Sequence, residues 1–272
     1  MKILHLVSDQ SFTLSVIEYT KELAKLTRSS VTLLYIASRS KDLEVGWATL
    51  SQAQKSFEDM AVKVKLEQGD VIDNFLAEIE QEEYDMVVLE ARRRRGLLPS
   101  NLRLKLKILD HSPIPVLMVR HANVKLERVL ICTGGLEISQ PVIKLSAALA
   151  GSAHLDAALL YVSGSPPSMF AGTEVTDDSL EKIMMGDTPL AQHLKHSAAQ
   201  LEEAGIRSRT VIRHGIVAES ILEEAQSGKY DLIVMGASKS KKDLSGFLLG
   251  DVTREVIEQA QSAVLIVKQG MS

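Results

Sequence analysis

The chain of 272 residues is long enough for about two domains, and its 45% hydrophobic and 24% charged residues are typical of a globular protein in water. A formal net charge of −4 argues against a protein that is basic throughout, and no apolar run reaches the roughly 18 residues of a membrane helix, so we expect no membrane partner. The only cysteine, Cys132, rules out an internal disulfide and lies in an apolar run. We therefore predict a packing role for Cys132 and a cytoplasmic protein.

The first half of the sequence alternates short apolar runs with segments of helical periodicity. The run at residues 31–37 is continuously apolar, as expected of a strand that is buried on both faces. A polar connection follows it, and the next helix is predicted around residues 50–60. The strands of this half are predicted at residues 2–8, 31–37, 62–66, 85–89 and 114–119.

The second half repeats this alternation. A stretch rich in glycine and proline at residues 164–187 predicts a long connection, and Pro189 suits the first turn of the helix that follows it. The strands of this half are predicted at residues 129–133, 155–162, 209–213, 230–235 and 262–267.

The two halves can be aligned with each other. Tyr84 and Asp85 correspond to Tyr230 and Asp231, and an insertion of about 20 residues within 164–187 explains why the offset between the halves grows along the chain. Strands that alternate with helices predict parallel sheets with right-handed crossovers. We therefore expect an α/β fold of two tandem doubly wound domains, residues 1–121 and 122–272, each with a five-stranded, mainly parallel sheet flanked by helices.

The stretch at residues 230–268 is the most informative part of the chain. A predicted strand ends at Gly236, a loop with three lysines follows, and Gly250 precedes a helix and a second apolar strand. A strand, a loop of small residues and a helix N-terminus in this order can present backbone N–H groups to an anion.

This pattern resembles the nucleotide-binding signature of the universal stress protein family, and nearly the whole chain resembles two universal stress protein domains in tandem. The signature is glycine, two residues, glycine, nine residues, glycine, and then serine or threonine. The resemblance implies a doubly wound parallel sheet, a role in stress survival, and ATP as a ligand that is bound but not required. It also implies pairing through the last strand, which predicts internal pairing of the two domains, with a homodimer as an alternative.

The match to the signature is partial. Lys239 takes the place of the second glycine, the next loop is one residue longer, and Asp251 replaces the serine or threonine. Gly134 stands where family members carry an aspartate near the adenosine. In the first half Glu90 occupies the position of Gly236, so we interpret the first domain as degenerate and structural.

Ligands of open parallel sheets bind beyond the carboxyl ends of the strands. The residues predicted to bind a nucleotide or other small anion are therefore Gly134, Gly135, Val162, Met235, Gly236, Ser238, Lys239, Gly250, Asp251, Val252 and Thr253. The alternative interpretation is that the glycines serve tight turns and the lysines lie in a solvated loop.

Two other groups of residues are candidate sites. Arg92–Arg95, with further basic residues up to Lys107, could bind a polyanion or RNA, but no aromatic residue accompanies them, so nucleic acid is not the preferred partner. His193 and His196 could share a metal on a helix, but no other ligand completes a site, and we predict no metal. No group of residues in the sequence has the pattern of a known catalytic site, so we predict no catalytic residues.

The sequence thus favours a stress-response protein that acts as a nucleotide- or small-anion-binding module, with the ligand in the second domain. The alternatives are a weak nucleotide hydrolase and a polyanion- or RNA-binding protein that uses Arg92–Arg95.

Overall fold

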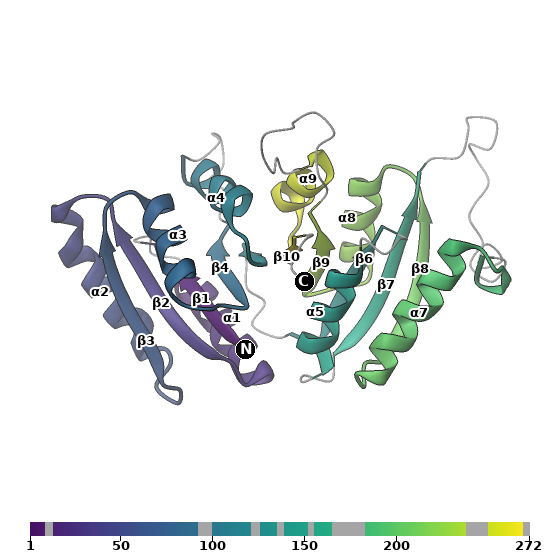
Figure 1. Ribbon diagram of the computed structural model, residues 1–272, viewed down its shortest axis with the longest axis horizontal. Coiled ribbons are helices and arrows are strands. Elements are labelled where there is room, and N and C mark those ends of the chain that lie inside the picture. The colour runs from purple at the N-terminus through teal and green to yellow at the C-terminus, as the bar shows by residue number, and fades with distance from the viewer. Residues whose placement is uncertain are drawn as a thin grey trace. The chain divides into compact units, whose positions relative to one another are not determined.

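The computed structural model describes residues 1–8, 13–91, 100–120, 126–134, 139–151, 155–164, 183–237 and 250–268. These residues form two compact units, of which the first ends at residue 120 and the second begins at residue 126 (Figure 1). In the part of the chain so described, no helix is both long and apolar enough to cross a membrane.

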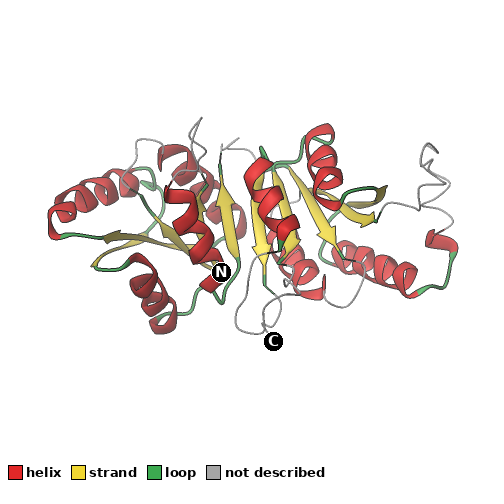
Figure 2. Ribbon diagram, turned by 90° about the horizontal axis from the view of Figure 1, so that it is seen from above, coloured by secondary structure: helices red, strands yellow, loops and turns green. Residues whose placement is uncertain are grey.

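The first unit contains a five-stranded sheet in the order β3-β2-β1-β4-β5, and the pairs within it are parallel. Helices pack on both faces of the sheet (Figure 2). The strands are β1 (Lys2–Leu6), β2 (Ser30–Ala37), β3 (Val62–Gln68), β4 (Met86–Glu90) and β5 (Val116–Val119). The helices are α1 (Thr13–Thr27), the 3₁₀ turn η1 (Ser40–Asp42), α2 (Leu43–Lys55), α3 (Val71–Gln81) and α4 (Ser100–His111).

The second unit repeats this topology, with a parallel sheet in the order β10-β9-β6-β7-β8. Helix α5 packs against α7, and α8 packs against α9. The strands are β6 (Arg128–Thr133), β7 (Asp156–Ser163), β8 (Ser208–His214), β9 (Leu232–Gly236) and β10 (Ala263–Val267), and the helices are α5 (Gln140–Gly151), α7 (Pro189–Glu203), α8 (Val217–Ser227) and α9 (Asp251–Gln259). The predicted fold class, an α/β fold of two doubly wound repeats, is confirmed.

Apolar strands form the core of each unit. All residues of β4, β5 and β10 are buried, as are the first four residues of β9. Helices on both faces of a parallel sheet exclude water from both sides, which explains why these strands read as continuous apolar runs. Strands β3 and β8 lie at an edge of their sheets and carry charged residues.

The predicted helix at residues 50–60 was misplaced, because α2 begins at Leu43 and ends at Lys55. Gly46, which we assigned to a polar connection, is buried inside this helix. A Cβ atom at Gly46 would come within 2.7 Å of the side chains of Tyr35 and Leu66. The glycine therefore lets α2 approach β2 and β3 closely, and it does not interrupt the helix.

The repeated tyrosine anchors a buried glutamate in each unit. In the first unit Tyr84 donates a hydrogen bond to Glu78 of α3 over 2.5 Å, and Lys65 of β3 lies 2.6 Å from the same carboxylate. Glu78 is only 4% exposed, so its charge depends on these partners. Burial, followed by the hydrogen bond to Glu78, raises the pKa of the Tyr84 hydroxyl.

The second unit contains the corresponding cluster around Glu224 of α8, which is 2% exposed. Arg209 donates to its carboxylate over 2.9 Å and Arg213 over 2.6 Å, and the hydroxyl of Tyr230 donates over 3.4 Å. The cluster fastens α8 to the edge strand β8 and thereby fixes the helix that forms one wall of the site described below.

The repeated aspartate that follows the tyrosine holds the start of the first strand in each unit. The carboxylate of Asp85 accepts the backbone N–H of Lys2 over 2.6 Å. The carboxylate of Asp231 accepts the N–H of Arg128 over 2.9 Å and that of Glu127 over 3.0 Å. The Tyr-Asp repeat is thus explained by packing and hydrogen bonding within each domain.

Candidate functional site

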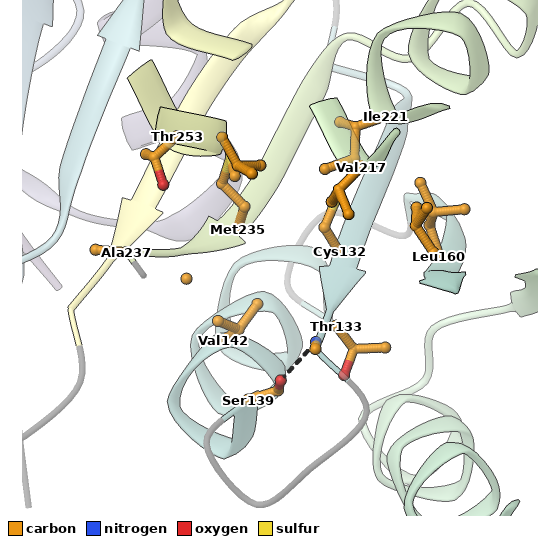
Figure 3. Close-up of a pocket in the computed structure, with 14 residues that line it drawn as sticks. Cys132, Thr133, Ser139, Val142, Leu160, Val217, Ile221, Met235, Ala237 and Thr253 are labelled. Atoms are coloured by element: carbon orange, nitrogen blue, oxygen red, sulfur yellow. Dashed lines mark hydrogen bonds between the residues drawn. The ribbon is translucent and has the colours of Figure 1, made fainter. Parts of the chain in front are cut away.

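A cavity of about 260 Å³ opens at the carboxyl ends of the central strands of the second unit (Figure 3). Its walls come from β6, β7 and β9 and from the beginnings of α5, α8 and α9. The lining residues are Cys132, Thr133, Gly134, Ser139, Val142, Leu160, Val162, Val217, Ile221, Met235, Gly236, Ala237, Val252 and Thr253. In the described part of the chain, no lysine, arginine, aspartate or glutamate lines it, so its interior suits an uncharged, largely apolar group.

Hydrogen bonds organise the backbone at the end of β6. The N–H of Gly134 donates to the hydroxyl of Ser139 over 2.9 Å, which ties the strand end to the start of α5 (Figure 3). The hydroxyl of Thr133 lies 2.7 Å from Nε2 of His193 on α7. Burial, and to a lesser extent His196, lower the pKa of His193, which favours the neutral imidazole in this contact.

Cys132 is partly exposed and lies in the wall of the cavity. Its side chain therefore lines the cavity, a position that the predicted packing role did not include. Burial raises the pKa of its thiol, and the negative charge of Glu224 raises it further. Because the thiolate is the nucleophilic form, this environment disfavours a reactive cysteine.

The beginning of α9 forms the polar end of the cavity. Gly250 is the N-cap residue and provides no side-chain cap. The backbone N–H groups of the first turn, which include those of Val252 and Thr253, have no acceptor within the helix. The hydroxyl of Thr253 is buried and has no hydrogen-bond partner among the described residues. In Figure 3 this hydroxyl points from α9 toward the side of the cavity where Ala237 lies.

Gly236 ends β9 between these two polar regions. A Cβ atom at this position would lie 3.5 Å from Val142, an ordinary van der Waals distance, so packing by itself does not require a glycine. The absence of a side chain leaves the floor of the cavity open.

Six of the predicted binding residues line this cavity: Gly134, Val162, Met235, Gly236, Val252 and Thr253. Gly250 and Asp251 begin α9 but do not line it, and Asp251 is exposed. Gly135, Ser238, Lys239 and the cluster Arg92–Arg95 lie outside the described residues.

Eight lining residues are not among the predicted binding residues: Cys132, Thr133, Ser139, Val142, Leu160, Val217, Ile221 and Ala237. The strand residues among them could have been found by extending the argument about strand ends to the residues just before each end. The residues from α5 and α8 carry no local motif. Within the described ranges, no three or more His, Cys, Asp or Glu side chains gather where they could hold a metal ion.

Two parallel-sheet domains of the same strand order, with a cavity at the carboxyl edge of the second, define a tandem α/β protein. The model of the Universal stress protein family matches residues 1–120 and, a second time, residues 125–268. The chain therefore belongs to the universal stress protein family and contains two of its domains in tandem.

Several known proteins are similar to parts or all of the chain. Universal stress protein MJ0531 of Methanocaldococcus jannaschii is 28% identical over 152 residues, which are 56% of this chain and 88% of that protein. The crystal structure of a universal stress protein from Archaeoglobus fulgidus has a TM-score of 0.69 at 16% identity. The match covers 99% of this chain and 98% of the chain in that structure. The crystal structure of a universal stress protein in complex with cAMP is 24% identical and has a TM-score of 0.40. The match covers 53% of this chain and 98% of the chain in that structure.

Proposed function

We propose that the second domain binds a nucleotide or a similar small anion and that the protein acts in the cytoplasm as a ligand-dependent stress-response module. We place the boundary between the two domains between residues 121 and 122. The observation that carries the proposal is the buried hydroxyl of Thr253, which has no partner among the described residues and lies in the first turn of an uncapped helix at the edge of the cavity.

Two regions of the lining suit two different chemical groups of a ligand. An uncharged ring fits against the apolar side chains, which include Val142, Leu160 and Ile221. An anionic group is favoured at the beginning of α9, where free backbone N–H groups and the positive end of the helix dipole attract negative charge. The hydroxyl of Thr253 supplies a further donor there.

Charge around the helix argues for a ligand with few negative charges. Asp251 is exposed in the first turn of α9 and repels a phosphate placed near it. No cation among the described lining residues offsets this repulsion. We therefore expect cAMP, with one negative charge, to bind more tightly than ATP.

We favour binding over nucleotide hydrolysis. The described lining carries no carboxylate that could act as a general base, and the side chain closest to that role, His193, contacts Thr133. Turnover of ATP that survives repurification and is lost in a Thr253→Val protein would instead support the hydrolase.

Calorimetric titration of the full-length protein with cAMP and with ATP plus magnesium tests the proposal. Thr253→Val removes the hydroxyl while keeping the shape of the side chain, and loss of one hydrogen bond should weaken cAMP binding by about 3–10-fold. Thr210→Val is the matched control, because Thr210 lies on β8 and does not line the cavity. Equal cAMP affinity in wild type and Thr253→Val, or an equal loss in both variants, would place the ligand elsewhere.

A further inference from the structure

The first unit contains a cavity of its own, of about 320 Å³, at the carboxyl ends of β1, β2 and β4. This position corresponds to that of the cavity in the second unit, but the lining differs in charge. Lys105, Arg39 and Asp42 line the cavity of the first unit, whereas no Lys, Arg, Asp or Glu lines the other among the residues described. The loss of the glycine signature from the first half has therefore not closed the cleft.

Lys105 of α4 is the unusual group in this lining. Its ammonium group makes no hydrogen bond or ion pair with any residue that the structure describes. Burial lowers the pKa of Lys105, and the negative charge of Glu90 partly opposes that effect. An ammonium group has three donors, and the Lys105 side chain is only partly exposed. A cation that lines a cavity and has no acceptor among the described residues is open to an acceptor from outside the chain.

The neighbouring ionisable groups do not take this role. Glu90 is buried but does not line the cavity, and its carboxylate accepts a hydrogen bond from the hydroxyl of Ser8 over 3.0 Å. His5 is buried, and its pKa is lowered to about 3, so it is neutral near pH 7. Its Nδ1 lies 3.0 Å from the hydroxyl of Thr20.

Arg39 adds a second cation to the lining. Its Nε donates to the carboxylate of Asp42 over 3.1 Å, which occupies one of the five N–H donors of the guanidinium group. The described lining thus carries two cations and one carboxylate. Most of the remaining wall is apolar, with Leu6, Ile36, Val71, Leu89, Leu104 and Ile108.

We propose that the cavity of the first unit binds a small organic carboxylate, whose apolar body lies against these side chains and whose carboxylate pairs with Lys105. The first domain is then a second ligand-binding domain, in place of the purely structural role that its sequence favours. A carboxylate suits the site better than a phosphate group, because Arg39 is already paired with Asp42, and the charge of Lys105 then matches a single negative charge.

Calorimetry with 2-naphthoate and with its uncharged amide, 2-naphthamide, tests this pairing in the full-length protein. We expect saturable binding of 2-naphthoate to the wild type and at least about tenfold weaker binding of the amide. Lys105→Met, which keeps the length and removes the charge, should weaken 2-naphthoate binding at least about tenfold and leave amide binding unchanged. Because the substitution replaces a partly exposed cation, which has no ion pair among the described residues, by an apolar side chain, we expect the variant to fold.

Lys107→Met is the matched control. Lys107 lies on the same helix, is exposed and does not line the cavity, so this variant should bind 2-naphthoate as the wild type does. Thr253→Val should also retain this binding, which separates the site from the cavity of the second unit. Glu90→Gln, which keeps a hydrogen-bonding partner for Ser8, should strengthen binding because it removes a competing negative charge.

Three results would overturn the proposal: no saturable binding of 2-naphthoate to the wild type, equal affinity for naphthoate and naphthamide, or equal affinities of Lys105→Met and Lys107→Met for naphthoate. The comparison of the two ligands on the wild-type protein decides the matter even if Lys105→Met fails to fold.

Discussion

Replacing Thr253 by valine should stabilise the ligand-free protein, although the same substitution weakens ligand binding. The hydroxyl of Thr253 is buried at the third position of α9 and has no hydrogen-bond partner among the described residues. Its desolvation is therefore not compensated in the free protein. A bound ligand would compensate it, so the substitution should have opposite effects on stability and on affinity.

The expected gain can be estimated from its components. An unsatisfied buried hydroxyl costs about 1–3 kcal/mol, and the additional methyl group of valine contributes up to about 0.8 kcal/mol if it packs well. Threonine and valine have similar helix propensities, so the backbone of α9 contributes little. We expect a gain of about 1–2 kcal/mol in the free energy of unfolding of the second unit, which corresponds to an increase of about 2–8 °C in its Tm.

Scanning calorimetry of the full-length protein measures the change in Tm. Because a chain of two domains can unfold in more than one step, hydrogen exchange of the amides of β9 and β10 should assign the change to the second unit. Thr210→Val should change the free energy of unfolding by less than about 0.5 kcal/mol. If Thr253→Val leaves stability unchanged or lowers it, the hydroxyl has a partner in the free protein, and the argument for a ligand at this point is wrong.

Three further substitutions test other parts of the structure. Glu224→Gln leaves two arginines without their carboxylate partner and should lower the free energy of unfolding by about 2–4 kcal/mol in urea titrations, whereas Glu223→Gln on the exposed side of α8 should have little effect. The pKa of His5 is lowered to about 3 by burial and by Lys105, so the unfolded chain binds a proton between pH 6.5 and 3 that the folded chain does not bind. Stability is therefore lost as pH falls through this window, and His5→Gln should remove a loss on the order of 2 kcal/mol between pH 6.5 and 4.5, measured by urea unfolding at each pH. Asp251→Ser should strengthen ATP binding about 2–5-fold at low salt, and an equal gain at high salt would show that the exposed charge is not the cause.

The sequence by itself determined the fold class and the repeat. Parallel strands that are buried on both faces must be apolar along their whole length, so β2, β4 and β10 are visible as continuous runs without any knowledge of their neighbours. The Tyr-Asp repeat reveals the two domains because the same buried glutamate and the same strand start have to be held in each. Spacing also placed Gly134, Gly236 and Thr253 near one sheet edge, since the ends of parallel strands meet there.

Only the tertiary structure decided which polar groups are satisfied and which cavities remain open. Gly46 falls in a predicted polar connection, but it lies inside α2, where a Cβ atom would collide with Tyr35 and Leu66. Whether Lys105 is a solvated surface charge or a cation in the wall of a cavity depends on segments distant along the chain, which include β1 and the end of β2. Hydrogen bonding and burial are set by neighbours in space, and residues far apart in sequence supply those neighbours, so no local pattern reports them.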